Sequence, residues 1–210
     1  MKNIIIAGCG PGHEDYLGQA TRKAVLTAEV LVGAQHLLDL FPQASCQQIV
    51  VRGPMADVLD QMDVLGEKKI CVLVTGDCGL FSLARLVVNR FGREQCHLIP
   101  GISSVQVAFA RLALDWSDAL LISAHGREPK KDISELSRYD KIALLAGDDH
   151  AISWAADRLK ELGAEYMAVS CENLTLTTEA IREFNDAELL RQACLPARTI
   201  LLLLKKELLP

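Results

Sequence analysis

A glycine-rich loop close to the start of the chain constrains the fold more than any other feature. Residues 8–12 read Gly-Cys-Gly-Pro-Gly and directly follow the apolar run 4–7. A buried strand that ends in such a loop brings bare backbone close to a ligand, because glycine permits positive φ angles and close approach. The pattern predicts an α/β domain with a nucleotide-type binding turn after its first strand.

The loop does not complete the dinucleotide-binding fingerprint. That fingerprint requires Gly-x-Gly-x-x-Gly opening a helix, and an acidic residue near the end of the second strand. Here His13 stands at the third glycine position, and the next apolar run, 30–33, ends without an acid. Pro11 also lacks the amide that a pyrophosphate could use. The loop therefore resembles a dinucleotide site without satisfying its requirements.

The composition is that of a folded protein without a preference for nucleic acids. Half of the 210 residues are hydrophobic, which suits one large domain or two small ones. The 22 basic and 27 acidic residues give a net charge of −5, and aromatic residues make up only 5%. We therefore expect no nucleic-acid partner. The apolar runs are too short for a membrane span, so we expect no membrane partner either.

Cysteine usage predicts a reducing compartment and no metal site. Seven cysteines are scattered along the chain without a Cys-x-x-Cys pair, and the histidines lack metal-site spacing. The cysteines are Cys9, Cys46, Cys71, Cys78, Cys96, Cys171 and Cys194. Most lie in or beside apolar runs, which indicates buried, reduced thiols and a cytoplasmic protein.

Short apolar runs alternate with amphipathic stretches, as is typical of α/β domains. The predicted strands are 3–7, 29–33, 48–51, 69–75, 96–99, 119–123, 141–146, 165–170 and 198–204. The predicted helices are 18–28, 54–65, 81–91, 149–162 and a segment that begins after Gly101. Residues 114–118 show no clear periodicity. We therefore predict an N-terminal domain over 1–113, a linker over 114–118 and a C-terminal domain over 119–210.

Two further glycine-containing loops follow predicted strands. Residues 75–81 read Thr-Gly-Asp-Cys-Gly-Leu-Phe, and residues 100–104 read Pro-Gly-Ile-Ser-Ser. In an open parallel sheet such loops converge on one edge, where ligands bind. Their carboxylate and hydroxyl groups suit a ligand with a ribose and amino groups, and no Walker lysine is present for a triphosphate. Each loop alone would fit a tight turn or helix cap, whereas three together favour a ligand site.

The three loops together resemble those of the tetrapyrrole methylase family, over essentially the whole chain. The resemblance implies two α/β domains, the first with a mostly parallel sheet and the second with a mixed one. It also implies S-adenosylmethionine in the cleft between the domains, and a homodimer. The implied cofactor contacts are Pro11, Asp77, Leu80, Phe81, Ser103, Ser104 and the neighbourhood of Leu145. Cys78 departs from the family, in which proline usually follows Gly-Asp, and this leaves the loop geometry open.

Four stretches narrow the resemblance within the family to methylation at carbon 5 of cobalt-precorrin-7 in cobalamin biosynthesis. They are residues 100–106, 108–112, 123–127 and 171–174. Methylation at another ring carbon, or diphthine synthase activity, is the nearest alternative. A non-catalytic sensor of nucleotides or metabolites is an alternative from another class. Related proteins can carry a fused carbon-15 methyltransferase and decarboxylase, and we expect that activity on a separate protein, because this chain ends at Pro210.

The acceptor would be an anionic tetrapyrrole with many carboxylates, which arginine binds in bidentate fashion. His125 and Arg127 follow a predicted strand and are candidate substrate contacts, as are Glu172 and Asn173 after a later strand. A solvated turn or a helix cap would also explain each pair. Because a methyl sulfonium is already a strong electrophile, alignment and exclusion of water suffice, and we assign no catalytic residue.

Overall fold

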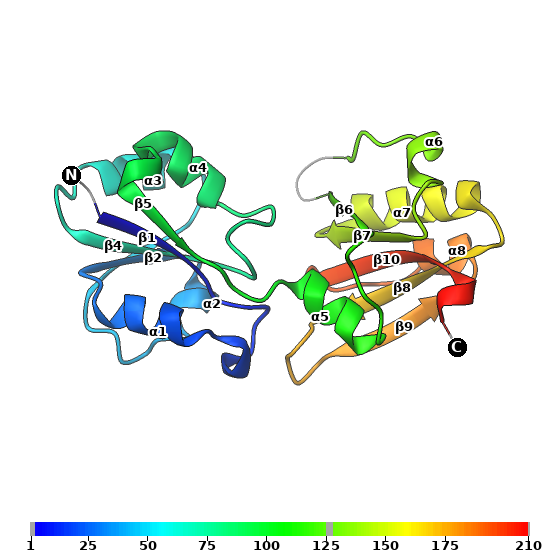
Figure 1. Ribbon diagram of the computed structural model, residues 1–210, viewed down its shortest axis with the longest axis horizontal. Coiled ribbons are helices and arrows are strands. Elements are labelled where there is room, and N and C mark those ends of the chain that lie inside the picture. Colours follow the sequence, from blue (N-terminus) through cyan, green and yellow to red (C-terminus); the bar gives the residue numbers. More distant parts are fainter. Residues whose placement is uncertain (1–2, 125–127, 210) are drawn as a thin grey trace. The chain divides into compact units, whose positions relative to one another are not determined.

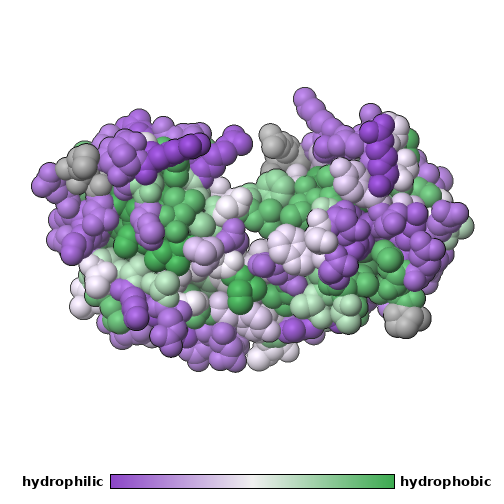
Figure 2. All heavy atoms as spheres, viewed as in Figure 1, coloured by the Kyte–Doolittle hydropathy of each residue, from purple (hydrophilic) through white to green (hydrophobic). Residues whose placement is uncertain are grey.

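The computed structural model describes residues 3–124 and 128–209 of the chain (Figure 1). The chain forms two compact units, Met1–Ser103 and Ser104–Pro210. Hydrophilic residues are widespread on the visible face of each unit, with smaller hydrophobic areas between them (Figure 2). Within the described ranges, no helix has both the length and the apolar character that a membrane crossing requires.

The first unit is a sheet of five parallel strands in the order β3-β2-β4-β1-β5. Its elements are β1 (Asn3–Gly8), α1 (Gln19–Leu26), β2 (Val30–Gly33), α2 (Gln35–Leu38), β3 (Gln47–Val50), α3 (Met55–Asp63), β4 (Lys69–Val74), α4 (Ala84–Phe91) and β5 (Cys96–Ile99). Short 3-10 helices lie at Glu14–Tyr16 and Arg93–Gln95. The predicted parallel α/β architecture of this half is confirmed.

Helices cover both faces of this sheet (Figure 1). Successive side chains along a strand point to opposite faces, so an uninterrupted apolar strand can feed two cores. In β1, Ile6 packs in one core with Val58 of α3. The next residue, Ala7, packs in the other core with Val25 of α1. Burial on both sides explains why β1, β2 and β4 are recognisable in the sequence as short continuous apolar runs.

The second unit contains a mixed sheet in the order β6-β7-β10-β8-β9. Its elements are α5 (Ser104–Arg111), β6 (Leu120–Ser123), α6 (Ile133–Leu136), β7 (Lys141–Ala146), α7 (Asp149–Leu162), β8 (Tyr166–Glu172), β9 (Ala180–Phe184), α8 (Ala187–Arg191), β10 (Thr199–Lys205) and the 3-10 helix Lys206–Leu208. Strands β6 and β7 are parallel, and β10 is antiparallel to both β7 and β8. The mixed sheet implied by the family resemblance is confirmed.

Helix α7 has the bounds that the sequence predicts. Asp148 accepts a hydrogen bond from the Ala151 amide at 3.0 Å and caps its first turn. Gly163, with φ of 86°, ends it in a conformation that favours glycine. Its apolar face packs on the sheet, where Ala155 and Leu201 belong to the same buried core.

The segment predicted as a linker is tied to the second unit. Lys141 of β7 is only 5% exposed, and its Nζ lies 3.1 Å from Asp115 Oδ2 and 2.5 Å from Asp118 Oδ1. A buried ammonium group needs such partners. Helix α5 also contacts β10. The chain divides into its two compact units after Ser103. The linker over 114–118 stays a prediction.

Candidate functional site

The three glycine loops of the first unit meet at the carboxyl edge of its sheet. A Cβ added to Gly8 would lie 2.6 Å from the Gly101 nitrogen and 2.7 Å from the Gly76 carbonyl oxygen. Real Cβ atoms cannot approach backbone atoms so closely, so glycine at position 8 is required for the backbones of these three loops to touch. The Gly76 amide also donates to the Gly10 carbonyl at 2.8 Å, and the Gly10 amide donates to the Gly76 carbonyl at 3.2 Å. The structure thus brings together the three loops that the sequence singled out.

The Asp77 carboxylate joins two of these loops. Its Oδ1 accepts a hydrogen bond from the Gly79 amide at 2.7 Å, and its Oδ2 accepts one from the Gly101 amide at 3.0 Å. A carboxylate has about four lone-pair sites, so two remain for hydroxyl or ammonium donors of a ligand. Asp77 can therefore hold the loops after β4 and β5 together and still face a ligand.

Sequence reasoning missed Thr21, which supports the first loop from α1. Its hydroxyl is fully buried and donates to the Gly8 carbonyl at 2.9 Å. The available signal was a hydroxyl on the apolar face of a predicted helix. Beside it, the Cys9 amide donates to the Val74 carbonyl, and burial raises the pKa of the Cys9 thiol to about 12. Cys9 is thus a packing residue and is protonated at neutral pH.

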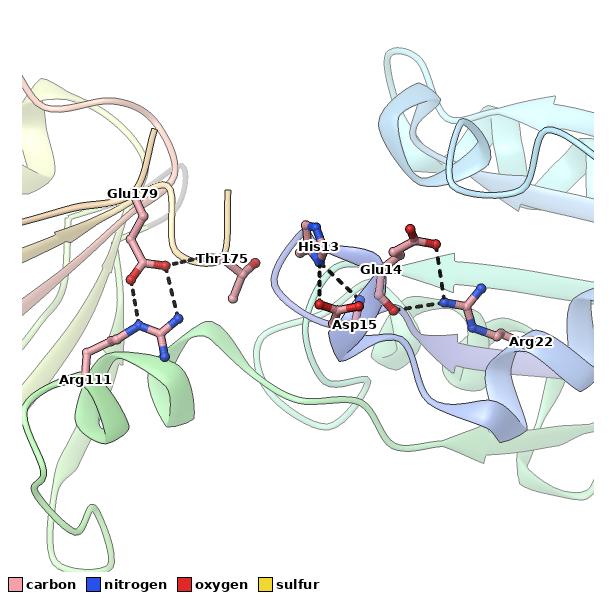
Figure 3. A network of polar contacts seen from close by, with 7 residues as sticks. All are labelled: His13, Glu14, Asp15, Arg22, Arg111, Thr175 and Glu179. Atoms are coloured by element: carbon pink, nitrogen blue, oxygen red, sulfur yellow. Dashed lines mark hydrogen bonds and ion pairs between the residues drawn. The ribbon is translucent and has the colours of Figure 1, made fainter. Parts of the chain in front are cut away.

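The first loop continues into a short helical turn rather than opening α1 (Figure 3). The His13 ring nitrogen Nδ1 accepts from the Asp15 amide at 3.3 Å and caps the turn. Arg22 of α1 donates to the Glu14 carbonyl at 2.9 Å. The turn explains the missing third glycine of the dinucleotide fingerprint, because His13 at that position caps a 3-10 helix that begins at Glu14.

Cys78 anchors the loop after β4 in the hydrophobic core. It is 7% exposed and packs in the same core as Val74 and Ala84. Burial raises the pKa of the Cys78 thiol, and its carbonyl accepts a hydrogen bond from the Ser82 hydroxyl. The position that is usually proline in the family is therefore occupied here by a buried thiol that packs in the core.

Phe81 combines exposure with a strained backbone. It is 55% exposed, and its φ is 47°, in the left-handed region that non-glycine residues rarely adopt. Such strain costs on the order of 1 kcal/mol and persists where the surroundings over-determine it, often at a ligand site. The preceding residue, Leu80, is half-buried. An exposed aromatic ring at the end of a glycine loop is a candidate ligand contact.

The remaining predicted cofactor residues come from three different segments of the chain. Pro11 is buried in the first loop. Ser103 is 5% exposed and directly precedes Ser104, the first residue of α5. Leu145 is half-buried in β7 of the second unit, where it pairs with Ser123 and Ile200.

Among the predicted substrate residues, His125 and Arg127 lie outside the described residues. The predicted position of Glu172 after the strand is wrong, because Glu172 is the last residue of β8 and is 6% exposed. Its Oε1 accepts from the Ser170 hydroxyl at 2.6 Å and from Arg182 Nε, on β9, at 2.7 Å. The Glu172 carboxylate thus joins β8 to β9 inside the second unit.

Asn173 does begin the loop after β8. Its φ is 46°, and its amide donates to the Arg198 carbonyl at 2.9 Å. Strands β7 and β8 are both antiparallel to β10, and β6 is parallel to β7. Asn173 therefore leaves the sheet at the edge where β6 and β7 also end.

Residues 3–190 match the family model of the tetrapyrrole (corrin/porphyrin) methylases, and the chain belongs to this family. Two curated relatives are also similar in sequence to this chain. A probable cobalt-precorrin-7 C(5)-methyltransferase of Methanocaldococcus jannaschii is 32% identical over 148 residues, which is 68% of this chain and 70% of the relative. A cobalt-precorrin-7 C(5)-methyltransferase of Salmonella typhimurium is 28% identical over 179 residues, 85% of this chain and 88% of the relative.

The fold is also that of a solved cobalamin-biosynthesis enzyme. The crystal structure of the precorrin-6Y methylase of Archaeoglobus fulgidus superimposes with a TM-score of 0.77 at 26% sequence identity. The match covers 97% of this chain and 98% of that one. Both units of the chain therefore have counterparts in one known methylase.

Proposed function

We propose that this chain transfers a methyl group from S-adenosylmethionine to carbon 5 of cobalt-precorrin-7, an anionic tetrapyrrole of cobalamin biosynthesis. The observation that carries the proposal is the meeting of the three glycine loops at one sheet edge. It occurs in a member of the tetrapyrrole methylase family, and the two curated relatives described above are named for this reaction. A tetrapyrrole methylase acting at another ring carbon is the second candidate, because such an enzyme would have the same cofactor loops.

The first unit fits a sulfonium cofactor. Glycine at 8 and 101 lets the backbones of the three loops pack directly against one another, so the loops present main-chain groups at one edge of the sheet. The free lone pairs of Asp77 can accept from ribose hydroxyls or an ammonium group, and Phe81 offers an apolar surface. The proposed contacts are Pro11, Asp77, Leu80, Phe81, Ser103 and Ser104, and Leu145 is retained from the family resemblance.

S-adenosylmethionine, when bound, supplies a methyl group on a positively charged sulfur, which is itself a strong electrophile. The task of the chain is then to hold donor and acceptor in line and to exclude water. Rigid backbone suits that task better than mobile side chains. We assign no general base.

The acceptor carries carboxylates, and residues of the second unit are the proposed contacts. Asn173 can donate through its amide group, and His125 and Arg127 remain candidates from the sequence. Glu172 is the weakest of the four, because its carboxylate already accepts from Ser170 and Arg182. A homodimer and a cytoplasmic location are part of the same proposal.

Calorimetry and product analysis test this function. We expect S-adenosylmethionine and S-adenosylhomocysteine to bind with micromolar affinity, and NAD and ATP not to bind. Incubation with cobalt-precorrin-7 and labelled methyl donor should add a single methyl group by mass spectrometry, located at carbon 5 by NMR. Absence of binding by both cofactor forms would overturn the methyltransferase proposal. A methyl group on another carbon would instead favour the second candidate.

Phe81 gives a prediction in which stability and binding move in opposite directions. Replacing Phe81 by glycine removes the left-handed strain, so we expect the free energy of unfolding to stay unchanged or rise by up to about 1 kcal/mol. Affinity for S-adenosylhomocysteine should fall about tenfold, because an apolar contact is lost. Urea unfolding and calorimetry measure the two quantities.

Leu86→Ala is the matched control for Phe81. Leu86 is a 41% exposed apolar residue on α4, in the same unit. Its replacement should leave the affinity unchanged. If the glycine variant at 81 bound as tightly as the original protein, Phe81 would not belong to the cofactor site.

A further inference from the structure

The loop that follows β8 holds two non-glycine residues in the left-handed region. Asn173 has φ of 46°, and Thr175 has φ of 70°. Asparagine tolerates this conformation, but for a β-branched residue such as threonine it is a genuine outlier. Strain of this kind persists only where surrounding contacts over-determine the backbone. The contacts around residues 173–179 are therefore what keeps this backbone in place.

Glu179 supplies the contact that holds this loop. Its Oε2 accepts a hydrogen bond from the Thr175 amide, at the strained residue itself. The backbone of the loop adds bonds from the Leu176 amide to the Asn173 carbonyl at 2.9 Å and from the Glu179 amide to the Leu176 carbonyl at 3.0 Å. The carboxylate of Glu179 thus faces back across its own turn.

Arg111, the last residue of α5, pairs with the same carboxylate through two nitrogens on one edge of its guanidinium group (Figure 3). Its Nε lies 2.6 Å from Glu179 Oε1, and its Nη2 lies 3.3 Å from Oε2. The hydrogen bond from Arg111 is the main cause that lowers the pKa of Glu179, so the pair stays ionised at neutral pH. A bidentate pair of this kind specifies geometry as well as energy.

The pair connects two places that the proposed function uses. Helix α5 begins at Ser104, a proposed cofactor contact, and ends at Arg111. The loop begins at Asn173, a proposed tetrapyrrole contact, at the edge where β6, β7 and β8 end. Both lie in the second unit. One ion pair therefore links the orientation of the loop to the end of the helix.

We propose that Arg111 and Glu179 are positioning residues. The pair holds the loop 173–179 in its strained form against α5. The side-chain amide group of Asn173 is thereby fixed for a carboxylate of the tetrapyrrole. This role rests on the proposed function. A loop free to relax would place Asn173 in many orientations, and misplacement by about 1 Å can cost a reaction up to 100-fold.

The test compares Glu179→Ala and Glu179→Gln with a control, Arg191→Ala. Glutamine keeps an oxygen that can accept from the Thr175 amide, but it lacks the negative charge that pairs with Arg111. Arg191 pairs with Asp157 at 2.7 Å and is 33% exposed, close to the 35% of Arg111, but it joins α8 to α7. The measurements are hydrogen–deuterium exchange over 173–179, kinetics with cobalt-precorrin-7, affinity for S-adenosylhomocysteine and thermal unfolding.

We expect the alanine variant at 179 to exchange about tenfold faster in the loop and to lose about tenfold or more in kcat/KM for the tetrapyrrole. Glu179→Gln should give an exchange rate and a kcat/KM between those of Glu179→Ala and the original protein. Affinity for S-adenosylhomocysteine should change less than about twofold in both, and Arg191→Ala should alter neither exchange in the loop nor kcat/KM.

Faster exchange with unchanged kcat/KM would overturn the positioning role. An equal loss of kcat/KM in Arg191→Ala would also overturn it, since general destabilisation would then explain the effect. Unchanged exchange in Glu179→Ala would show that the pair does not hold the loop. If the original protein failed to bind S-adenosylhomocysteine, the proposed function would fall, and the exchange data would still decide whether the pair holds the loop.

Discussion

Replacing Gly101 by alanine is expected to abolish measurable binding of S-adenosylhomocysteine and to lower the free energy of unfolding by about 3 kcal/mol. The new Cβ would lie 2.3 Å from the Gly76 carbonyl oxygen and 2.8 Å from the Gly8 carbonyl carbon. Both neighbours are backbone atoms, so no side chain can rotate out of the way. The loops after β1, β4 and β5 would have to move apart, and the proposed site would be lost.

Urea unfolding and calorimetry measure the two effects, and Gly18→Ala is the control. Gly18 precedes α1 with φ of −60°, and an added Cβ would meet no heavy atom within 4 Å. Its replacement should cost less than about 1 kcal/mol and leave affinity unchanged. If the Gly101→Ala variant bound S-adenosylhomocysteine normally, the assignment of the three loops to the cofactor site would be contradicted.

Replacing Asp77 by alanine is expected to weaken binding of S-adenosylhomocysteine by about 100-fold and to destabilise the first unit by about 2–3 kcal/mol. The Gly79 and Gly101 amides would lose their charged acceptor, and each such loss costs on the order of 1–3 kcal/mol. The two loops would then no longer be joined, and the ligand would lose its acceptor as well. Both quantities should therefore fall together.

Asp77→Asn separates the two roles, because the amide keeps one oxygen for one of the two backbone donors. We expect it to lose roughly half of the stability that alanine loses. The control is Asp60→Ala, which breaks an exposed pair with Arg90 at 3.0 Å and should cost less than about 1 kcal/mol. A loss of stability in Asp77→Ala with normal affinity would limit Asp77 to joining the loops.

The parts of the fold that were predictable are those with local, repeated signals. Strand β7 and helix α7 have the predicted bounds, because one is an apolar run and the other has an amphipathic period with a cap at each end. Strand β9 was missed, since only its first and last residues are shielded from solvent and the three between them are exposed. Helices α2, α6 and α8 have four or five residues, too few for a periodic signal.

The sequence predicted which loops form the site, but not which residues the side chains there would bond to. Glycine at 8, 76 and 101 follows three strands, and carboxyl ends of parallel strands share an edge whatever the details of packing. The error at Glu172 has the opposite cause. The predicted strand ended at Ser170, so Glu172 was assigned to the following loop, whereas β8 continues to Glu172. The contact that buries the Glu172 carboxylate comes from Arg182 of β9, and it depends on the pairing of β8 with β9.

The sequence by itself determined the α/β class, the three glycine loops and the exclusion of a Walker-type phosphate site, because each follows from residues adjacent in the chain. Only the tertiary structure decided that Asp77 joins the loops after β4 and β5, that Thr21 supports Gly8, and that Arg111 holds Glu179. The last pair spans 68 residues and depends on the packing of α5 within the second unit. Contacts between distant residues arise from packing and strand order, which no local pattern encodes.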